Sequence, residues 1–218
     1  MVLVSHRYKF IYIKLQKVAG TSVESFFGQF CCDPELPYVF EHGSDESVTE
    51  FGIVGARMGG KEHKWLPHKS AYSIQKDIGE HIFRTYFKFC VIRNPWDTVV
   101  SFYCWYNKDA KQTKEDFTKF VKLFQNRDWK LHTLDDTLAC DYYIRYERLE
   151  QDIAYVCSRL GIEDYDITQL PEFKKGMRRL NNHYSEYYTD ETTEIIRKKF
   201  RREIELFGYT FEKSESKP

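Results

Sequence analysis

The sequence lacks an excess of charge of either sign, because its 33 lysine and arginine residues are matched by 33 aspartate and glutamate residues. A strong basic excess is typical of proteins that bind nucleic acid or an anionic membrane. We therefore expect neither as a partner, and any anion-binding site must be local. The sequence does not indicate an oligomeric state.

Long apolar runs are also missing, and none approaches the ~18 residues that indicate a membrane-spanning helix. His6, Arg7 and Lys9 interrupt the N-terminal segment before a signal-like apolar stretch could form. We expect a soluble, cytoplasmic protein.

The six cysteines form no CxxC pair. Together with His63 or His68 they also lack the ligand spacing of a zinc site. We expect reduced thiols, mostly packed in the core as small apolar groups, and no metal site.

The most informative stretch is residues 8–27. Residues 8–15 mix aromatic and β-branched side chains without glycine or proline, which predicts a strand buried on both faces of a parallel sheet. Residues 16–20 then form a turn. Thr21 or Ser22 could provide the N-cap of a helix that buries Val23, Phe26 and Phe27.

A tight turn from a buried strand into a helix gathers backbone N–H groups at the positive end of the helix dipole, which favours an anion. Ala19 and Gly20 let the backbone approach a phosphate, Lys17 adds a positive charge, and Thr21 and Ser22 add hydroxyl donors. Because the lysine precedes the glycine, this is not a Walker A motif. A purely structural strand-turn-helix connection is the alternative.

A second stretch repeats this pattern. Residues 87–92 predict a buried strand, with Asn94 as N-cap and Pro95 in the first helical position. Arg93 follows the strand at the end where ligands bind in open α/β sheets, and Ser101 lies about two helical turns later. Two such turns predict two anionic groups on one ligand, as in a doubly phosphorylated nucleotide.

The rest of the chain completes an α/β pattern. We expect a long excursion over residues 31–64, a helix over 70–83 with a break near Gly79, and an inserted amphipathic helix around residues 117–124. A third strand over 142–146 leads to a helix over 149–160, and one long helix runs from residue 190 to Gly208. The basic residues 174–179 form either a solvated face or a loop that closes over the nucleotide. The expected fold is a single α/β domain over residues 1–211, with a central parallel β-sheet flanked by helices and a polar tail over 212–218.

Three segments resemble the carbohydrate-type sulfotransferases (sulfotransferase family 2-like). KVAGTS is similar to their 5′-phosphosulfate loop, VIRNPWDTVVSFY to their 3′-phosphate motif, and the segment HYSEYYTDETTEIIRKKFRREIELFGYTF to their closing segment. The chain departs from the pattern at Leu15-Gln16, Val18 and Thr98, and at Val18 one hydroxyl contact to the donor is missing.

The resemblance implies a P-loop-like sulfotransferase fold and 3′-phosphoadenosine 5′-phosphosulfate (PAPS) as the donor. It assigns the 5′ side of PAPS to Lys17, Val18, Ala19, Gly20, Thr21 and Ser22. It assigns the 3′-phosphate to Arg93 and Ser101.

The same resemblance implies catalytic roles for Lys17, which neutralises the leaving phosphate, and for His68, about two dozen residues before Arg93, as general base. Glu41, His42 and His63 remain open as alternative bases. The implied acceptor is a carbohydrate hydroxyl, with a small metabolite or a tyrosine as alternatives. A P-loop-like kinase and a non-catalytic nucleotide-binding module are the rival functions.

Overall fold

The computed structural model describes residues 1–41, 43–57, 62–108, 113–171 and 183–214. Its strands are β1 (Leu3–Ser5), β2 (Phe10–Ile13), β3 (Ser47–Val48), β4 (Gly52–Val54), β5 (Phe87–Ile92), β6 (Thr133–Leu134), β7 (Thr137–Leu138) and β8 (Tyr142–Arg145). Its α-helices are α1 (Gly20–Gly28), α2 (Ala71–Ile78), α3 (Glu80–Thr85), α4 (Pro95–Tyr106), α5 (Lys114–Leu123), α6 (Leu149–Leu160), α7 (Asp190–Lys199) and α8 (Arg201–Phe207). Short 3₁₀ helices are η1 (Gln29–Cys31), η2 (Asp128–Leu131), η3 (Tyr146–Arg148), η4 (Ile167–Gln169) and η5 (Tyr184–Tyr187).

Backbone packing divides the chain into two compact units. The first comprises Met1–Ile92 and Asp128–Phe173 and contains the large β-sheet. The second comprises Arg93–Arg127 and Lys174–Pro218 and contains α4, α5, α7 and α8. The expectation of one domain over residues 1–211 stays a prediction.

The large sheet has six strands in the order β3-β4-β1-β2-β5-β8. The three strands expected from the sequence are present as β2, β5 and β8, and they pair in parallel. The expected purely parallel sheet is wrong, however, because β1 and β4 pair antiparallel to their neighbours and β3 pairs antiparallel to β4. These added strands have two or three residues each, too few to show the alternation by which a strand is recognised.

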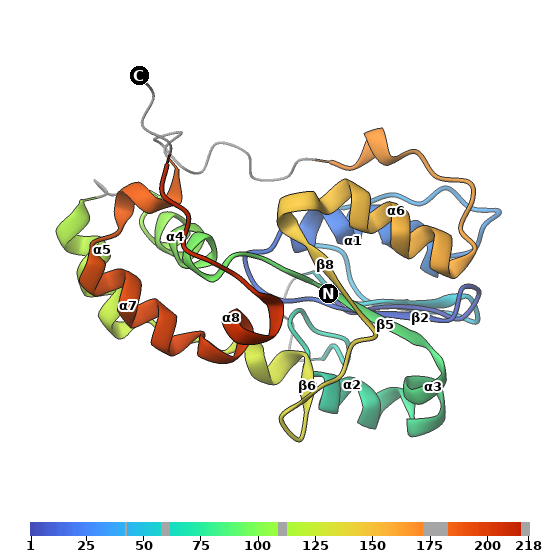
Figure 1. The fold of residues 1–218 in the computed structure, drawn as a ribbon. Helices are drawn as coiled ribbons and strands as arrows, with labels where there is room; N and C mark the ends of the chain where they lie inside the picture. The colour runs from blue at the N-terminus through green and yellow to red at the C-terminus, as the bar shows by residue number, and fades with distance from the viewer. Residues whose placement is uncertain (42, 58–61, 109–112, 172–182, 215–218) are drawn as a thin grey trace. The chain divides into compact units, whose positions relative to one another are not determined.

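Helices cover both faces of this sheet. Figure 1 shows α1 and α6 on one face and α2 and α3 on the other. All four residues of β2 are buried, and the rings of Phe10, Phe27 and Phe89 pack edge-on or tilted against one another between the sheet and α1. Burying an aromatic or aliphatic side chain of this kind contributes about 1.5–3 kcal/mol, so this layer anchors both ends of the β2–α1 connection.

The second unit is organised around the start of α4. Asn94 caps the helix as predicted, since its Oδ1 accepts the backbone N–H of Trp96 at 3.1 Å and that of Asp97 at 3.4 Å. Its Nδ2 donates to the Thr210 carbonyl at 3.0 Å. The buried Trp96 donates its indole N–H to the Thr193 carbonyl at 3.1 Å, so the closing segment is bound to α4.

Other helix predictions are confirmed, with one correction. The break at Gly79 separates α2 from α3, Gly161 ends α6, and Thr189 caps α7. The expected single C-terminal helix is instead α7 and α8, because Phe200 (φ −113°, ψ 23°) leaves the helical conformation between them.

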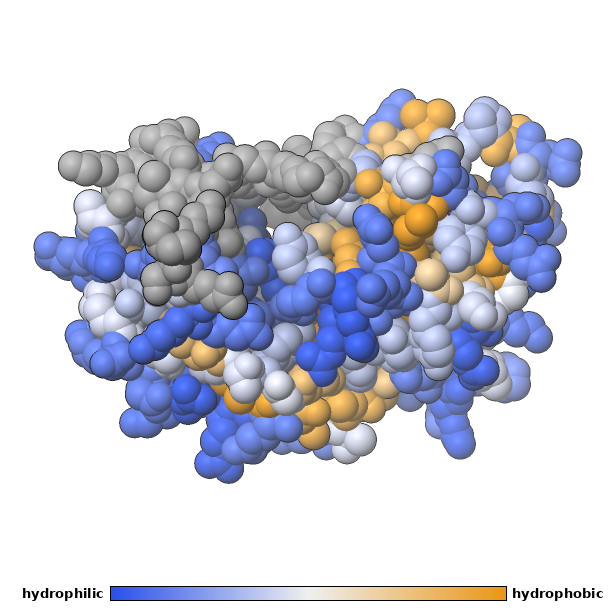
Figure 2. Space-filling model, turned by 45° about the horizontal axis from the view of Figure 1, so that its top comes forward, coloured by the Kyte–Doolittle hydropathy of each residue, from blue (hydrophilic) through white to orange (hydrophobic). Residues whose placement is uncertain are grey.

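Figure 2 shows a face that is mostly hydrophilic, with smaller hydrophobic patches between the polar residues. None of the helices in the described ranges combines the length and apolarity required to cross a bilayer. Cys31, Cys90, Cys104 and Cys157 are buried thiols, as expected.

The antiparallel extension of the sheet can be tested at Gly52 in β4. A methyl group there would lie 2.1 Å from the Val4 carbonyl oxygen and 2.9 Å from that of Cys31, both backbone atoms. We expect Gly52→Ala to lower the free energy of unfolding by about 2–3 kcal/mol, as other overpacked sites do. Chemical denaturation measures this change. The matched control is Gly161→Ala, where the added methyl group meets nothing within 4 Å and only the positive φ opposes it. A smaller effect at Gly52 than at Gly161 would contradict the β1–β4 pairing.

Candidate functional site

The turn between β2 and α1 has an unusual backbone. Lys17 (φ 60°) and Ala19 (φ 61°) both lie in the left-handed region, which costs a non-glycine residue on the order of 1–3 kcal/mol. Such strain concentrates at ligand sites, and turns that mix left- and right-handed residues point successive N–H groups into an anion-binding concavity. The turn therefore carries backbone strain of the kind that concentrates at ligand sites.

Helix α1 begins two or three residues earlier than expected. Ala19, rather than Thr21 or Ser22, is its N-cap, and the Ala19 carbonyl accepts the N–H groups of Ser22 at 3.0 Å and Val23 at 3.3 Å. No side chain in the described residues caps this helix start. Thr21 and Ser22 accordingly keep their hydroxyl groups for contacts other than the cap.

Asp128 tethers the turn. Its Oδ2 accepts the backbone N–H of Gln16 at 3.1 Å, from η2 more than a hundred residues further along the chain. A carboxylate that accepts a backbone N–H forms a stronger bond than a neutral acceptor does. This contact holds the beginning of the strained turn against the rest of the first unit.

Burial differs along the turn. Val18 (2% exposed) and Ser22 (4% exposed) are buried, whereas Lys17, Ala19 and Thr21 are partly accessible. Gly20 is buried as well, and a Cβ atom there would lie 2.9 Å from Cε of Lys14. The absence of a side chain at Gly20 therefore makes room for Lys14, a role that the sequence did not indicate.

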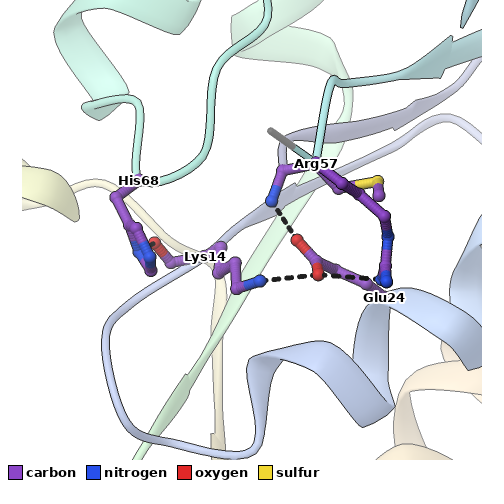
Figure 3. Close-up of polar contacts among 5 residues, drawn as sticks. Lys14, Glu24, Arg57 and His68 are labelled. Atoms are coloured by element: carbon purple, nitrogen blue, oxygen red, sulfur yellow. Dashed lines mark hydrogen bonds and ion pairs between the residues drawn. The ribbon is translucent and has the colours of Figure 1, made fainter. Parts of the chain in front are cut away.

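Lys14 belongs to a buried ionic cluster around Glu24, which is 1% exposed (Figure 3). Nζ of Lys14 lies 2.6 Å from Oε2 of Glu24, Nη2 of Arg57 lies 3.4 Å from the same oxygen, and the amine of Met1 bonds to Oε1. Burial alone would raise the pKa of Glu24, but the Met1 amine and Lys14 outweigh burial and lower it. Glu24 is therefore an ionised carboxylate inside the first unit.

Sequence reasoning missed this cluster, although one signal was present. Glu24 lies between Val23 and Phe27 on the side of α1 that packs against the sheet, and it follows Gly20 by one helical turn. A carboxylate on a buried helix face needs a cationic partner.

His68 lies beside the same lysine. Its Nδ1 is 3.2 Å from the carbonyl oxygen of Lys14, and its backbone is left-handed (φ 57°). Figure 3 shows the imidazole ring against the Lys14 backbone. When Nδ1 carries the proton it donates to this carbonyl, and Nε2 then keeps the lone pair that a base uses.

The pKa of His68 is lowered to about 4, first by burial and next by the positive charge of Lys14. The dipole of the following helix is not the cause. That helix, α2, begins at Ala71 behind its own N-cap Ser70. The imidazole is neutral at physiological pH because it is buried beside a cation.

Arg93 directly follows β5 and opens the second unit. Its Nε and Nη2 lie 2.6 Å and 2.5 Å from Oδ2 of Asp97, in the first turn of α4. Both side chains are nearly buried, and the contact fixes the direction of the guanidinium group. Ser101 lies further along α4 and is partly accessible.

The alternative bases have different surroundings. Glu41 is exposed, and Nε2 of His63 lies 3.2 Å from Oδ1 of Asp45. His42 and the basic residues 174–179 lie outside the described residues.

These observations define an α/β protein with a strained, cation-flanked turn of the kind that binds an anionic group. A family model described as "Sulfotransferase family" matches residues 1–210, and the chain belongs to that family, as its motifs indicated. Membership supports a sulfotransferase enzyme, which needs a sulfate donor and a hydroxyl-bearing acceptor.

Among curated proteins, an uncharacterized protein of Archaeoglobus fulgidus is 33% identical over 104 residues, which cover 44% of this chain and 87% of the relative. No solved structure matches the chain.

The state of His68 gives a pH-dependent prediction. Because the folded-state pKa (about 4) is below the ordinary value of 6.5, the unfolded chain binds the proton more readily, and stability falls as the pH is lowered from about 6.5 towards 4. We expect the free energy of unfolding of His68→Gln to depend less steeply on pH, by a slope that corresponds to roughly a fraction of one bound proton. Chemical denaturation between pH 4.5 and 7.5 measures this slope. An NMR titration that found the His68 pKa at or above 6.5 would contradict the burial of the ring.

Proposed function

We propose that the protein transfers a sulfuryl group from PAPS to a hydroxyl group of a carbohydrate, on a P-loop-like sulfotransferase fold, with His68 as general base. The observation that carries the proposal is the 3.2 Å contact between Nδ1 of His68 and the carbonyl of Lys14. Lys14 stands three residues before Lys17 in the strained turn. The segment from Lys14 to Lys17 thus contacts the candidate base through Lys14 and enters the candidate donor loop at Lys17.

In this proposal residues 17–22 bind the 5′-phosphosulfate group. The left-handed Lys17 and Ala19 and a helix start without a side-chain cap in the described residues support this role. The Lys17 ammonium group and the turn amides offset the negative charge that develops on the leaving phosphate.

Arg93 and Ser101 bind the 3′-phosphate in the same proposal. Support comes from the pairing of β2 with β5, which are adjacent and parallel. The chain leaves two such strands at the same edge of a sheet, which is where α/β proteins bind nucleotides. The contact with Asp97 orients the Arg93 guanidinium for a phosphate as well as balancing its charge.

The chemistry is an in-line transfer. The acceptor oxygen forms a bond to sulfur while the bond between sulfur and the bridging oxygen of the 5′-phosphate breaks, and adenosine 3′,5′-bisphosphate leaves. The acceptor proton passes to Nε2 of His68, a contribution typically worth ~10²- to 10⁴-fold. The anionic donor raises the pKa of an adjacent imidazole from its low resting value, which strengthens the base when donor is bound.

The function is tested by incubating the protein with labelled PAPS and a panel of acceptors that includes oligosaccharides, small phenols, alcohols and tyrosine peptides. We expect label in a carbohydrate product, identified by mass spectrometry. Label only in a phenol or a peptide would show that the acceptor is not a carbohydrate, but the protein would still be a sulfotransferase. Transfer of phosphate from Mg-ATP instead would favour the kinase alternative.

Three variants separate binding from chemistry. Arg93→Ala is expected to weaken binding of adenosine 3′,5′-bisphosphate by one to two orders of magnitude, as the loss of a charge-assisted contact does. His68→Ala should bind it normally but lose transfer by ~10²- to 10⁴-fold. Lys17→Ala should lose turnover more than nucleotide affinity. Calorimetry and initial rates measure the two effects.

Normal nucleotide affinity in Arg93→Ala would remove its assigned role. If His68→Ala retained sulfuryl transfer, the general base would instead be Glu41, His42 or His63. Single substitutions of these three residues would then identify it.

A further inference from the structure

The buried ion pair between Lys14 and Glu24 adjoins His68 without being part of either sequence motif. Nζ of Lys14 and Oε2 of Glu24 are 2.6 Å apart, and the Lys14 side chain lies across Gly20 at the start of α1. The carbonyl of the same lysine faces Nδ1 of His68 at 3.2 Å. Lys14 therefore connects the carboxylate on the helix to the imidazole.

We propose that Glu24 is a positioning residue for the transfer reaction. By holding the Lys14 ammonium group, Glu24 fixes the carbonyl that orients His68. Glu24 also balances the positive charge that Lys14 brings beside the imidazole. The inference rests on the proposed function of His68 as base. It adds a role for two residues that the motifs do not include.

The geometric part of the role follows from packing. The Lys14 side chain has 14% of its surface exposed and Glu24 has 1%, so neither group can swing into solvent without opening the start of α1. Removing one partner of such a buried pair leaves the other charge uncompensated. We expect the Lys14 side chain to move away when Glu24 is removed and to displace the strand end whose carbonyl faces His68.

The electrostatic part follows from the charges that act on His68. These are Lys14 after β2, the amine of Met1 before β1, and Glu24 on α1. Lys14 and the amine disfavour a protonated imidazole, while Glu24 favours it. Burial lowers the pKa of the Met1 amine to about 5, so the amine is still charged near pH 4, where His68 titrates, and is neutral at physiological pH, where Lys14 and Glu24 are the two opposed charges of these three.

The test compares Glu24→Gln, Lys14→Met and the double variant Lys14→Met/Glu24→Gln. We expect Glu24→Gln to lower the pKa of His68 and reduce kcat/KM on the order of 10- to 100-fold, as small misplacements of a catalytic group do. Lys14→Met should raise the pKa of His68. The double variant should recover most of the activity that Glu24→Gln loses, because the uncompensated ammonium is gone.

The pKa of His68 is read by NMR titration of the nucleotide-free protein, and kcat/KM by labelled transfer. Thermal unfolding checks that each variant folds. The matched control is Glu80→Gln in α3, the same change at an ion pair with Arg84 that is 71% exposed on the glutamate side, and it should alter neither readout.

Opposite pKa shifts in the two single variants support the proposal, since a merely structural role would not separate them. A folded Glu24→Gln with unchanged His68 pKa and unchanged kcat/KM overturns it, as does a double variant no more active than Glu24→Gln. If Glu24→Gln does not fold, the pKa must be lower in the double variant than in Lys14→Met, and equality overturns the proposal.

The NMR arm needs no turnover. If the wild-type protein transfers no sulfate from PAPS, the proposed function fails while the coupling of Glu24 to His68 is still measured.

Discussion

Lys14 is the residue on which the arrangement of the first unit's candidate site depends. Lys14 directly follows β2, its carbonyl faces Nδ1 of His68, and its side chain crosses Gly20 to reach Glu24. One residue thus relates the sheet, the first helix and the histidine to one another. The strained turn begins only two residues later, at Gln16, where Asp128 holds the backbone from the other side. The turn is consequently fixed at both of its ends by charged groups.

Long, locally consistent elements could be predicted from the sequence. Residues 87–92 followed by Asn94 and Pro95 combine a buried strand, an N-cap and a first-position proline, and the structure has all three. The same holds for Gly161 after α6 and Thr189 before α7. In each case the signal comes from residues within one helical turn of the boundary.

The missed features depend on contacts between distant residues. Strand β1 has three residues and is recognisable only through its partners β2 and β4. The position of Glu24 on the apolar face of α1 signals a need for a cationic partner, but only the fold reveals that Lys14 is that partner. The low pKa of His68 also depends on distant residues, because burial by the surrounding chain cannot be read from the position of a residue before a helix.

Resemblance to a family supplied what local patterns could not. Local patterns left a purely structural connection as the alternative for the turn over residues 16–20, and its lysine-first order only excluded the Walker A motif. The family model that matches residues 1–210 confirms the class of enzyme. The donor, the acceptor and the assigned residues are proposals, supported by the left-handed turn and by the parallel β2–β5 pair.

The ionic cluster around Glu24 cannot be explained by stability alone. Replacing a buried ion pair by well-packed apolar residues is often neutral or stabilising, because removing two charges from water offsets most of their attraction. The left-handed Lys17 and Ala19 do not serve stability either, because each raises the free energy of the folded state by on the order of 1–3 kcal/mol. Lys14 and Glu24 flank residues 17–22, the strained segment that we propose binds the donor. A fold that needed only to be stable could omit the charges and the strain. In the proposed site each has a function, because the Lys14 cation favours the neutral imidazole, Glu24 holds that cation in place, and the strained turn binds the donor.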